Sequence, residues 1–416
     1  MPPALASETP PGAAVHETAC IVVGGGPAGM VLAYLLARAG VGVTVLEAQG
    51  DFARDFRGDT LHPSILEALD AVGLTERLLR RPHARVYEGA VTDVEAGERV
   101  VVADLRRLRS PFPFIALMPQ EDFLAFLAEE AARFPAFRLV MGANVTALIE
   151  EDGVVRGVRY GGHEVRAPLT VATDGRASRV RKLAGLTLDE QAPPMDVLWF
   201  RLPRRDADPE ADAVAGYVGH DGLLVLIERD DHWQAGFVVP KGGYRALRAE
   251  GIAAFRAAVA RRAPWLGGRL EAVGDWGDVA LLTVQAGLAP RWHRPGLLLL
   301  GDAAHPMSPV AGVGINYAVM DAVAAANRLV GPLLRGAVAE ADLAGVQRRR
   351  QGPVRRAQAV QRAAQEVLVR RALAGRGLPP LARRLPRVPL LHRLPAWFVG
   401  HGFGRVRPDA RVFARS

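Results

Sequence analysis

Ala19–Gly29, with the sequence ACIVVGGGPAG, is the segment that decides the fold of this chain. Its apolar, β-branched start predicts a buried parallel strand. The strand runs into a G-x-G-x-x-G pattern at Gly24, Gly26 and Gly29. In such a turn the first glycine allows the tight bend, the second lets backbone approach a pyrophosphate, and the third lets helix and strand pack closely. We count the intervening Pro27 and Ala28 with the glycines as candidate cofactor-binding residues.

The residues after this turn complete a dinucleotide-binding pattern. A helix is expected over residues 30–38, Gly40 ends it, and a second strand over residues 41–46 leads to Glu47. The free N–H groups and the positive dipole end of the helix suit phosphates. Glu47 can accept hydrogen bonds from an adenosine ribose. The pattern by itself does not separate NAD from FAD.

Composition limits the remaining function classes. The chain has 416 residues, of which 50% are hydrophobic and 23% charged, and this predicts two or three globular domains. Its one cysteine, Cys20, excludes an internal disulfide framework and a Cys-rich metal site, and we expect no metal. Residues 1–16 lack the features of a signal peptide and are interpreted as a disordered tail. With no apolar run of about 18 residues, we expect a soluble cytoplasmic protein.

The basic charge is concentrated at the C-terminal end. The net charge is +8, but residues 348–416 contain 17 Arg, no Lys and two acidic residues, a sum of +15. The rest of the chain therefore carries −7, which argues against a nucleic-acid-binding core. The Arg-rich segment is either a solvated helix face or a peripheral contact for a membrane or another anionic partner.

A second glycine motif follows a strand near residue 300. Leu297–Leu300 is a run of four leucines that ends in Gly301 and Asp302. A carboxylate at the carboxyl end of a parallel strand faces the ligand crevice and suits polyol hydroxyls. The loop then reaches Gly312, Gly314 and Asn316, which open a helix whose N–H groups suit an electron-rich atom. The alternative is an ordinary helix cap and turn.

The other segments give a coarse layout. Residues 86–104 alternate as a β-hairpin, Gln120 starts an amphipathic helix to about residue 133, and residues 138–172 contain several strands. Ser64 is a candidate N-cap for a helix over residues 64–71, with Glu67 completing a capping box. Residues 196–286 look like a mostly antiparallel sheet interrupted by a helix over 252–261. Further helices are expected up to residue 328 and over 354–373.

The chain resembles the class A FAD-dependent monooxygenases, the para-hydroxybenzoate hydroxylase and UbiH-like group of aromatic hydroxylases. The resemblance covers roughly residues 17–330 and rests on three blocks: Gly24–Gly29, Asp174-Gly175, and Gly301 to Asn316 through Pro309. It implies that the second block touches the FAD pyrophosphate region and NAD(P)H. The third block would hold the ribityl chain and the flavin ring. Arg57 matches an arginine that meets the FAD phosphates, and Gln120 a polar residue near the ribose.

The resemblance also implies a reaction. NADPH or NADH reduces FAD, O2 adds to give a C4a-hydroperoxide, and an aromatic or quinone-like small molecule is hydroxylated or epoxidised. His305 and Pro309 are the candidates beside the face of the flavin that reacts with oxygen. A general base is not identified from spacing. Other side chains that could reach the pocket are His62, Trp199, Tyr217, His220 and Phe237.

The implied fold is mixed α/β: a Rossmann-like FAD-binding domain with an inserted antiparallel β-sheet domain and C-terminal helices. The expected FAD-binding parts are residues 17–85, 105–195 and 287–345. The expected substrate-binding parts are 86–104 and 196–286, and residues 346–416 form the Arg-rich helical segment.

Four alternatives remain. A reductase of the geranylgeranyl-reductase kind would use FAD and NAD(P)H without inserting oxygen. A flavin-dependent halogenase lacks support because its Trp-x-Trp-x-Ile-Pro signature is absent. A non-catalytic FAD-binding or lipid-surface protein would depend on the basic tail. An NAD-dependent dehydrogenase would be colourless when purified.

Overall fold

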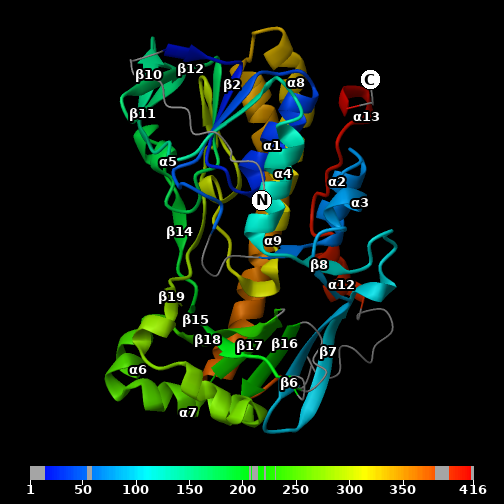
Figure 1. Ribbon diagram of the computed structural model, residues 1–416, viewed down its shortest axis with the longest axis vertical. Helices are drawn as coiled ribbons and strands as arrows, with labels where there is room; N and C mark the ends of the chain where they lie inside the picture. Colours follow the sequence, from blue (N-terminus) through cyan, green and yellow to red (C-terminus); the bar gives the residue numbers. More distant parts are fainter. Residues whose placement is uncertain are drawn as a thin grey trace.

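The computed structural model describes residues 15–53, 59–205, 208, 214–219, 222–229, 231–379 and 393–413. The predicted tail therefore lies almost entirely outside the described residues, as do Arg57 and His220. Figure 1 shows two halves along the long axis of the molecule, one built on a parallel sheet with long helices and the other on an antiparallel sheet. The predicted mixed α/β fold is confirmed.

The first half is organised around the strand of the opening motif. Its six-stranded sheet has the order β21-β22-β13-β2-β3-β9, in which all neighbours are parallel except the edge strand β21. The strands are β2 (Cys20–Val23), β3 (Val43–Leu46), β9 (Phe137–Val140), β13 (Leu169–Ala172), β21 (His293–Arg294) and β22 (Leu297–Leu299). Strands β2, β13 and β22 are adjacent and parallel, so their carboxyl ends point the same way. The segments that follow these three strands therefore lie close together at that end of the sheet.

Long helices cover this sheet and bury its apolar residues. They are α1 (Pro27–Arg38), α4 (Gln120–Ala131), α8 (Gly314–Leu334) and α9 (Glu340–Ala364). The predicted apolar face of α4 is correct, since Phe123, Leu124, Leu127 and Ala131 are buried in the main core. A smaller sheet with the order β1-β12-β11-β10 packs beside it, formed by β1 (Val15–Glu17), β10 (Val145–Glu151), β11 (Val154–Tyr160) and β12 (His163–Arg166).

The predicted capping box at residue 64 is wrong. Helix α2 spans Pro63–Asp70, and His62 occupies the N-cap position without a side-chain cap. Proline is favourable in the first helical turn because its missing N–H would be unpaired there. The Ser64 hydroxyl instead donates to Asn316 Oδ1 over 2.6 Å. Glu67 binds Ser110 and the C-terminal Arg407, so both polar residues serve tertiary contacts.

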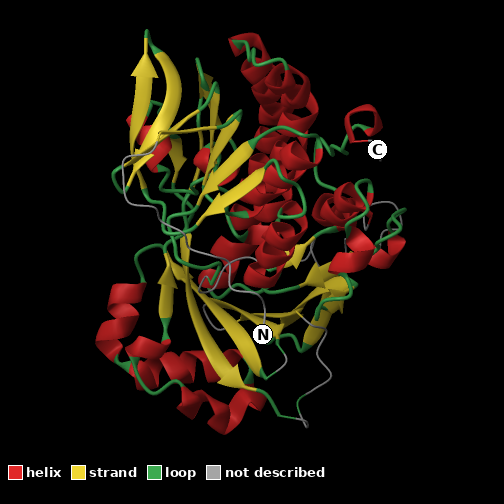
Figure 2. Cartoon of the chain, turned by 45° about the horizontal axis from the view of Figure 1, so that its top comes forward, coloured by secondary structure: helices red, strands yellow, loops and turns green. Residues whose placement is uncertain are grey.

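The second half contains a seven-stranded sheet in the order β19-β15-β18-β17-β16-β6-β7. Its strands are β6 (Glu88–Asp93), β7 (Glu98–Asp104), β15 (Met195–Pro203), β16 (Val214–Gly219), β17 (Gly222–Glu228), β18 (His232–Pro240) and β19 (Ala280–Leu282). Figure 2 shows helices α6 (Tyr244–Glu250) and α7 (Ile252–Arg262) on the outer side of this sheet. Phe200, Leu224 and Phe237 pack against Phe255 of α7 and leave the opposite face of the sheet for the interior.

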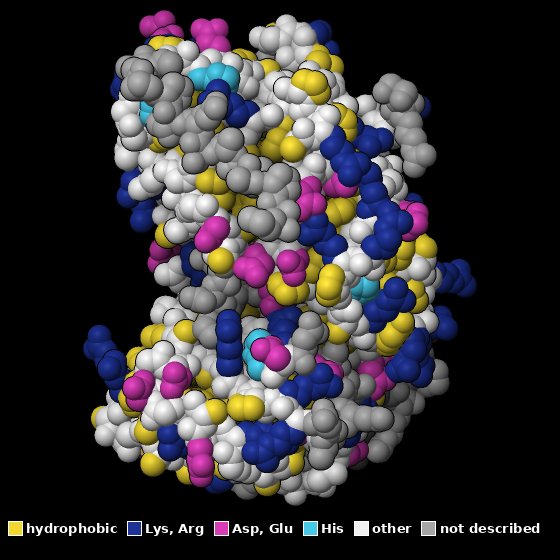
Figure 3. All heavy atoms as spheres, in the orientation of Figure 1, with side chains coloured by type: hydrophobic (Ala, Val, Ile, Leu, Met, Phe, Trp, Pro, Cys, Tyr) yellow, Lys and Arg dark blue, Asp and Glu magenta, His cyan; other side chains and the backbone are white. Residues whose placement is uncertain are grey.

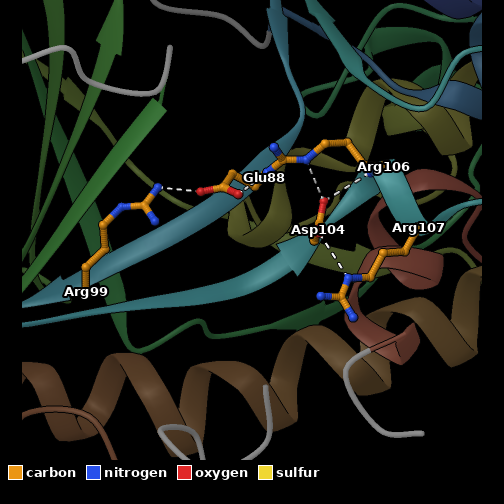
Figure 4. A network of polar contacts seen from close by, with 5 residues as sticks. All are labelled: Glu88, Arg99, Asp104, Arg106 and Arg107. Atoms are coloured by element: carbon orange, nitrogen blue, oxygen red, sulfur yellow. Dashed lines mark hydrogen bonds and ion pairs between the residues drawn. The ribbon is translucent and has the colours of Figure 1, made fainter. Parts of the chain in front are cut away.

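The predicted hairpin over residues 86–104 is confirmed as β6 and β7, which extend this sheet at its edge. Figure 4 shows an ionic network along the hairpin, in which Glu88 binds Arg99 and Arg106 while Asp104 binds Arg106 and Arg107. Charged side chains on an edge strand discourage pairing with other chains. The network therefore keeps the hairpin in register and protects its outer edge.

Shorter elements complete the two halves and the segments between them. They are β4 (Thr60–Leu61), α3 (Thr75–Leu78), β5 (Ala84–Val86), η1 (Leu105–Arg107), β8 (Ile115–Leu117), α5 (Arg179–Leu183), β14 (Asp189–Gln191), η2 (Pro264–Ala272), η3 (Trp276–Asp278), β20 (Ala286–Leu288), η4 (Gly301–Ala303) and η5 (Val310–Gly312). Strands β4, β8 and β5 form a three-stranded sheet.

The C-terminal segment is folded onto both halves. Helix α9 begins at Glu340 and crosses the expected boundary at residues 345/346, and it continues as a π-helical turn η6 (Gln365–Val369), α10 (Arg370–Leu373), α12 (Arg393–Gly400) and α13 (Ala410–Phe413). Figure 3 shows Lys and Arg side chains gathered on the side where α2, α3 and the chain end lie. Part of this charge is paired, because Arg405 and Arg407 both bind Glu67.

Candidate active site

A cavity of about 1590 Å³ lies between the two halves and collects most of the predicted site residues. Sites for single drug-sized ligands are typically about 300–1,000 Å³, so this cavity has room for more than one such group. The predicted residues that line it are Gly24, Gly26, Pro27, Ala28, Glu47, Gln120, Asp174, Gly175, Asp302, Pro309, Gly312 and Gly314. The three sequence motifs therefore converge on one space.

The glycine turn is shaped for close contact on one side and open on the other. Gly24 has φ +105°, and a Cβ there would lie 2.5 Å from the carbonyl oxygen of Thr173. A Cβ on Gly29 would lie 2.1 Å from the Gly24 carbonyl oxygen. A Cβ on Gly26 would meet nothing within 4 Å, and Gly26 lines the cavity. The N-terminus of α1 therefore presents bare backbone to the cavity, which is the cradle that a dinucleotide pyrophosphate requires.

Glu47 directly follows β3, lies beside this turn and is buried. Its Oε2 accepts a hydrogen bond from the Gly25 N–H over 2.7 Å, and its Oε1 accepts one from the Gln49 N–H over 2.9 Å. Each carboxylate oxygen can accept more than one hydrogen bond. The side chain thus fixes the turn while it faces the cavity where the ribose is expected.

The two candidate aspartates lie on the same side of the parallel sheet. Asp174 follows β13, and its carboxylate accepts from the Ser178 hydroxyl and the Val180 N–H. Burial raises the pKa of Asp174, although these hydrogen bonds lower it. Asp302 follows β22, is half-buried and lines the cavity. Asp174 therefore also orders the start of α5, a role that spacing alone did not indicate.

A row of buried glutamines supports the loop that carries Pro309. Gln358, Gln361 and Gln365 share one face of the helix that starts with α9. The amide of Gln361 donates to the carbonyl oxygens of Ser308 and Val310, over 2.8 and 2.9 Å. These two carbonyls flank Pro309, so the C-terminal helix fixes the shape of the cavity wall at that residue.

Three of the predicted site residues that the structure describes, Gly29, His305 and Asn316, do not line the cavity, and Gly29 packs α1 against the Gly24 turn instead. His305 is buried, its Nε2 lies 2.5 Å from Asp321 Oδ2, and its ring packs on Trp292. Asn316 is also buried, and its side chain binds Ser64. The expectation that the His305 side chain lies beside the reacting groups is not supported, because the buried carboxylate of Asp321 holds it behind the wall. Of the open candidates, His62 and Trp199 line the cavity, while Tyr217 and Phe237 belong to the cluster around α7.

Sequence reasoning missed a buried ionic network behind the Gly301 turn. Asp321 on α8 accepts from the Gly301 N–H and from Arg350 Nε, over 3.1 and 2.7 Å. Arg350 also donates to the carbonyl oxygen of Gly404 over 2.6 Å. Burial raises the pKa of Asp321, but the charges of His305 and Arg350 outweigh it and leave this pKa below its usual range. The network connects three separate segments to the turn that precedes Asp302.

A second polar cluster links the two halves at the cavity. Arg229, after β17, binds the carboxylate of Asp59 and the side-chain carbonyl of Gln234 on β18. Asp59 also accepts from the N–H of Gln120, the first residue of α4. Burial raises the pKa of Asp59, although the charge of Arg229 lowers it. Asp59, Gln120 and Gln234 line the cavity, so its wall is polar at this end.

Histidine 62 joins the chain end to the Gly312 loop. Its Nδ1 lies 2.6 Å from the carbonyl oxygen of Val399 on α12, and its Nε2 lies 3.0 Å from that of Gly312. Burial lowers the pKa of His62, although both carbonyls favour the charged form. A neutral imidazole has one N–H to donate, so one of these two contacts lacks a proton at neutral pH.

This arrangement predicts sensitivity to acid. Because the pKa of His62 is lower in the folded chain than the ordinary value of 6.5, the unfolded chain binds the proton first as the pH falls. The free energy of unfolding is then fully retained above pH 6.5 and falls below it. The lowered pKa values of His293 and His401 act in the same direction.

Thermal unfolding between pH 5 and 8 checks this expectation. The variant His62→Gln should show a shallower fall of Tm below pH 6.5 than the unchanged protein. His163→Gln, on β12 and away from the cavity lining, serves as the control. Equal slopes for all three proteins would show that His62 does not carry the acid sensitivity.

No cluster of three or more His, Cys, Asp or Glu side chains suited to a metal ion occurs among the described residues. Within the same ranges, no helix is both long and apolar enough to span a bilayer. Cys20 is buried in β2, and burial raises the pKa of its thiol to about 12.

Comparison with known proteins agrees with this geometry. A model of the FAD binding domain family matches residues 17–363. The chain is 38% identical over 398 residues to the 6-methylpretetramide 4-monooxygenase of Streptomyces rimosus, covering 93% of this chain and 92% of the relative. It is 31% identical over 325 residues to the ubiquinone hydroxylase UbiL of Rhodospirillum rubrum, covering 74% and 72%.

Solved structures share the fold. PqsL of P. aeruginosa in complex with 2-aminobenzoylacetate aligns with a TM-score of 0.74 at 24% identity, over 86% of this chain and 99% of that chain. The anhydrotetracycline hydroxylase OxyS of Streptomyces rimosus aligns with a TM-score of 0.72 at 23% identity, over 92% and 76%. The cradle at Gly26, the convergence of the three motifs and the family match lead to one conclusion: this chain is an enzyme of the FAD-dependent class A monooxygenase family.

Proposed function

We propose that the enzyme uses NAD(P)H and O2 to hydroxylate a polycyclic aromatic small molecule of the polyketide type. The observation that carries this proposal is the continuity of the cavity. It runs from the glycine turn and Glu47, past Asp302, to the apolar face of the seven-stranded sheet. The relative with 38% identity supports the substrate class, since its name gives a hydroxylation of 6-methylpretetramide.

The residues present fit FAD, which when bound would supply the redox chemistry and the activation of O2. The N–H groups at the start of α1 would bind the diphosphate, with Gly26 giving close access. Glu47 would accept hydrogen bonds from the adenosine ribose, and Asp302 from the ribityl hydroxyls. Gly312 and Gly314 open α8, whose positive end would face the flavin ring.

The C-terminal segment closes the other side of the cavity. Leu394, Trp397 and Phe398 of α12 and the following Phe403 line it, as does Val369 beyond α9. A cover of apolar side chains excludes water from the reacting groups. We therefore propose that this Arg-rich segment acts mainly as the roof of the active site. The exposed arginines of this segment can still contact an anionic surface.

The function is tested by a screen of phenols and polycyclic aromatic compounds for stimulated NADPH oxidation by the FAD-loaded enzyme, with isotope-labelled O2 followed into the product. Label in a hydroxylated product is the expected result. NADPH consumption with a reduced product and no label would favour the reductase alternative instead.

Asp302 provides a residue-level prediction. Asp302→Ala should weaken FAD binding by at least about tenfold, which corresponds to about 1.4 kcal/mol, because a hydrogen-bond acceptor for the ribityl chain is lost. Fluorescence titration of the apoprotein with FAD measures the change. Asp278→Ala, on η3 of the other half, is a control in which FAD affinity should stay the same. Unchanged FAD affinity in Asp302→Ala would remove this residue from the site.

A further inference from the structure

The cavity-facing side of the seven-stranded sheet is built in rows. Along each strand alternate residues face opposite sides, and the face that carries Phe200 and Leu224 is covered by α7. On the other face, cross-strand partners line up into a middle row. Its members, from β15 to β6, are Trp199, Gly236, Val225, Gly216 and Val91, and all of them line the cavity.

One neighbouring row is closed by the C-terminal segment. Val197 and Val238 pack with Val369 in one buried cluster, and Val218 packs with Ala372 and Leu378 in another. These residues lie two positions along the strands from the middle row. Apolar side chains of the C-terminal segment therefore cover the sheet on this side of the middle row.

The row on the other side of the middle row is polar at one end. Gln234, two residues before Gly236, lines the cavity. Its side-chain carbonyl accepts a hydrogen bond from Arg229, and Arg229 also binds the carboxylate of Asp59. The partner of Gln234 on β17 is Ile227. The middle row thus lies between an apolar row, which the C-terminal segment covers, and a row that offers the hydrogen-bonding side chain of Gln234.

The middle row is a shallow strip, which we call the glycine strip, formed by Gly216, Gly236, Val225 and Trp199. A Cβ on Gly236 would lie 2.9 Å from the ring of Trp199, so the indole occupies the space that a side chain there would take. A Cβ on Gly216 would lie 3.2 Å from Val91 Cγ2. The floor of the strip is therefore made of the backbone at the two glycines, the side chain of Val225 between them and the indole of Trp199, and both glycines are needed to keep it low.

The length of the strip indicates what fits on it. Gly236 and Gly216 are two strands apart, which corresponds to about 10 Å. This exceeds a single benzene ring and matches a linear system of several fused rings. A flat aromatic system also gains from contact with an indole.

We propose that the glycine strip is the floor on which a planar, fused-ring substrate lies, with an oxygen-bearing edge toward Asp59 and Gln234. Gly216 and Gly236 then determine the preference for polycyclic over single-ring aromatic compounds. This inference rests on the proposed aromatic hydroxylase function and specifies its substrate.

The test compares two probes on the FAD-loaded enzyme, a hydroxylated tetracenequinone and phenol. Binding is measured by the change in flavin absorbance without NADPH. Gly216→Val fills the strip with a residue that strands favour, and Gly236→Ala displaces the indole into it. Each should raise the Kd for the tetracyclic probe at least about tenfold and that for phenol less than about twofold. Gly268→Ala, at an exposed site outside the cavity lining, should change neither value.

The outcomes separate the strip from the wider proposal. Equal changes for both probes, no change for either, or a wild-type enzyme that binds phenol but not the tetracyclic probe would overturn the strip alone. A wild-type enzyme that binds no aromatic compound and oxidises NADPH with none would overturn the aromatic hydroxylase function itself. If Gly236→Ala fails to retain FAD, Gly216→Val alone decides the question.

Discussion

Replacing Gly29 with alanine is expected to destabilise the whole FAD-binding half. The added Cβ would lie 2.1 Å from the Gly24 carbonyl oxygen and 2.7 Å from Thr173 Oγ1, and both are fixed by the contact between β2 and β13. Overpacking at a rigid backbone contact costs about 3 kcal/mol or more. Urea unfolding of the apoprotein should show a much lower midpoint, or the variant should be recovered only as aggregate.

Gly26→Ala is the matched control, and it should behave in the opposite way. Its Cβ meets nothing within 4 Å, and its φ of −75° suits alanine. The unfolding midpoint of the apoprotein should therefore change by no more than about 0.5 kcal/mol. FAD affinity should fall at least about tenfold, because the methyl group occupies the approach of the pyrophosphate. If both variants lose the same stability, the turn is shaped by folding alone and not for a ligand.

The second large effect is expected from Arg350→Met. Asp321 would stay buried with its charge but without the guanidinium that now binds it over 2.7 Å. Removing one partner of a buried ion pair typically costs about 3–5 kcal/mol. Since Asp321 also binds the Gly301 N–H, the turn before Asp302 should loosen and FAD should be lost more readily. Urea unfolding and FAD titration measure the two effects.

Arg349→Met is the control for this variant because Arg349 is the exposed neighbour on the same helix. Its effect should stay within about 0.5 kcal/mol. The double variant Arg350→Met with Asp321→Asn removes the buried charge and should recover part of the lost stability. Similar midpoints for Arg350→Met and Arg349→Met would mean that the buried pair does not stabilise the fold.

Local chemistry made much of the fold predictable. The β-branched run before Gly24, the alternation over residues 86–104 and the apolar periodicity after Gln120 each determine a strand, a hairpin or a helix with little help from distant residues. The convergence of Glu47, Asp174 and Asp302 on one cavity also followed, because strand ends in a parallel sheet share an edge.

Features set by distant contacts were missed. Strand β16, with the sequence VAGYVG, has weak local signals and is defined by its pairing with β6 and β17. Arg350 lies in a run of three arginines that is typical of a solvated helix, yet it is fully buried against Asp321. His305 has the sequence position of a pocket residue, but the same carboxylate draws it into the core.

The packing of the chain end onto its beginning has a consequence for biosynthesis. Val399, His401 and Phe403 contact His62, Glu67 and Tyr317, so this late segment completes a wall whose other side includes residues synthesised much earlier, His62 and Glu67. Synthesis proceeds from the N-terminus, and early segments fold first. The cavity wall can therefore be completed only after residues 399–403 have been synthesised, and it stays incomplete until they pack against His62 and Glu67.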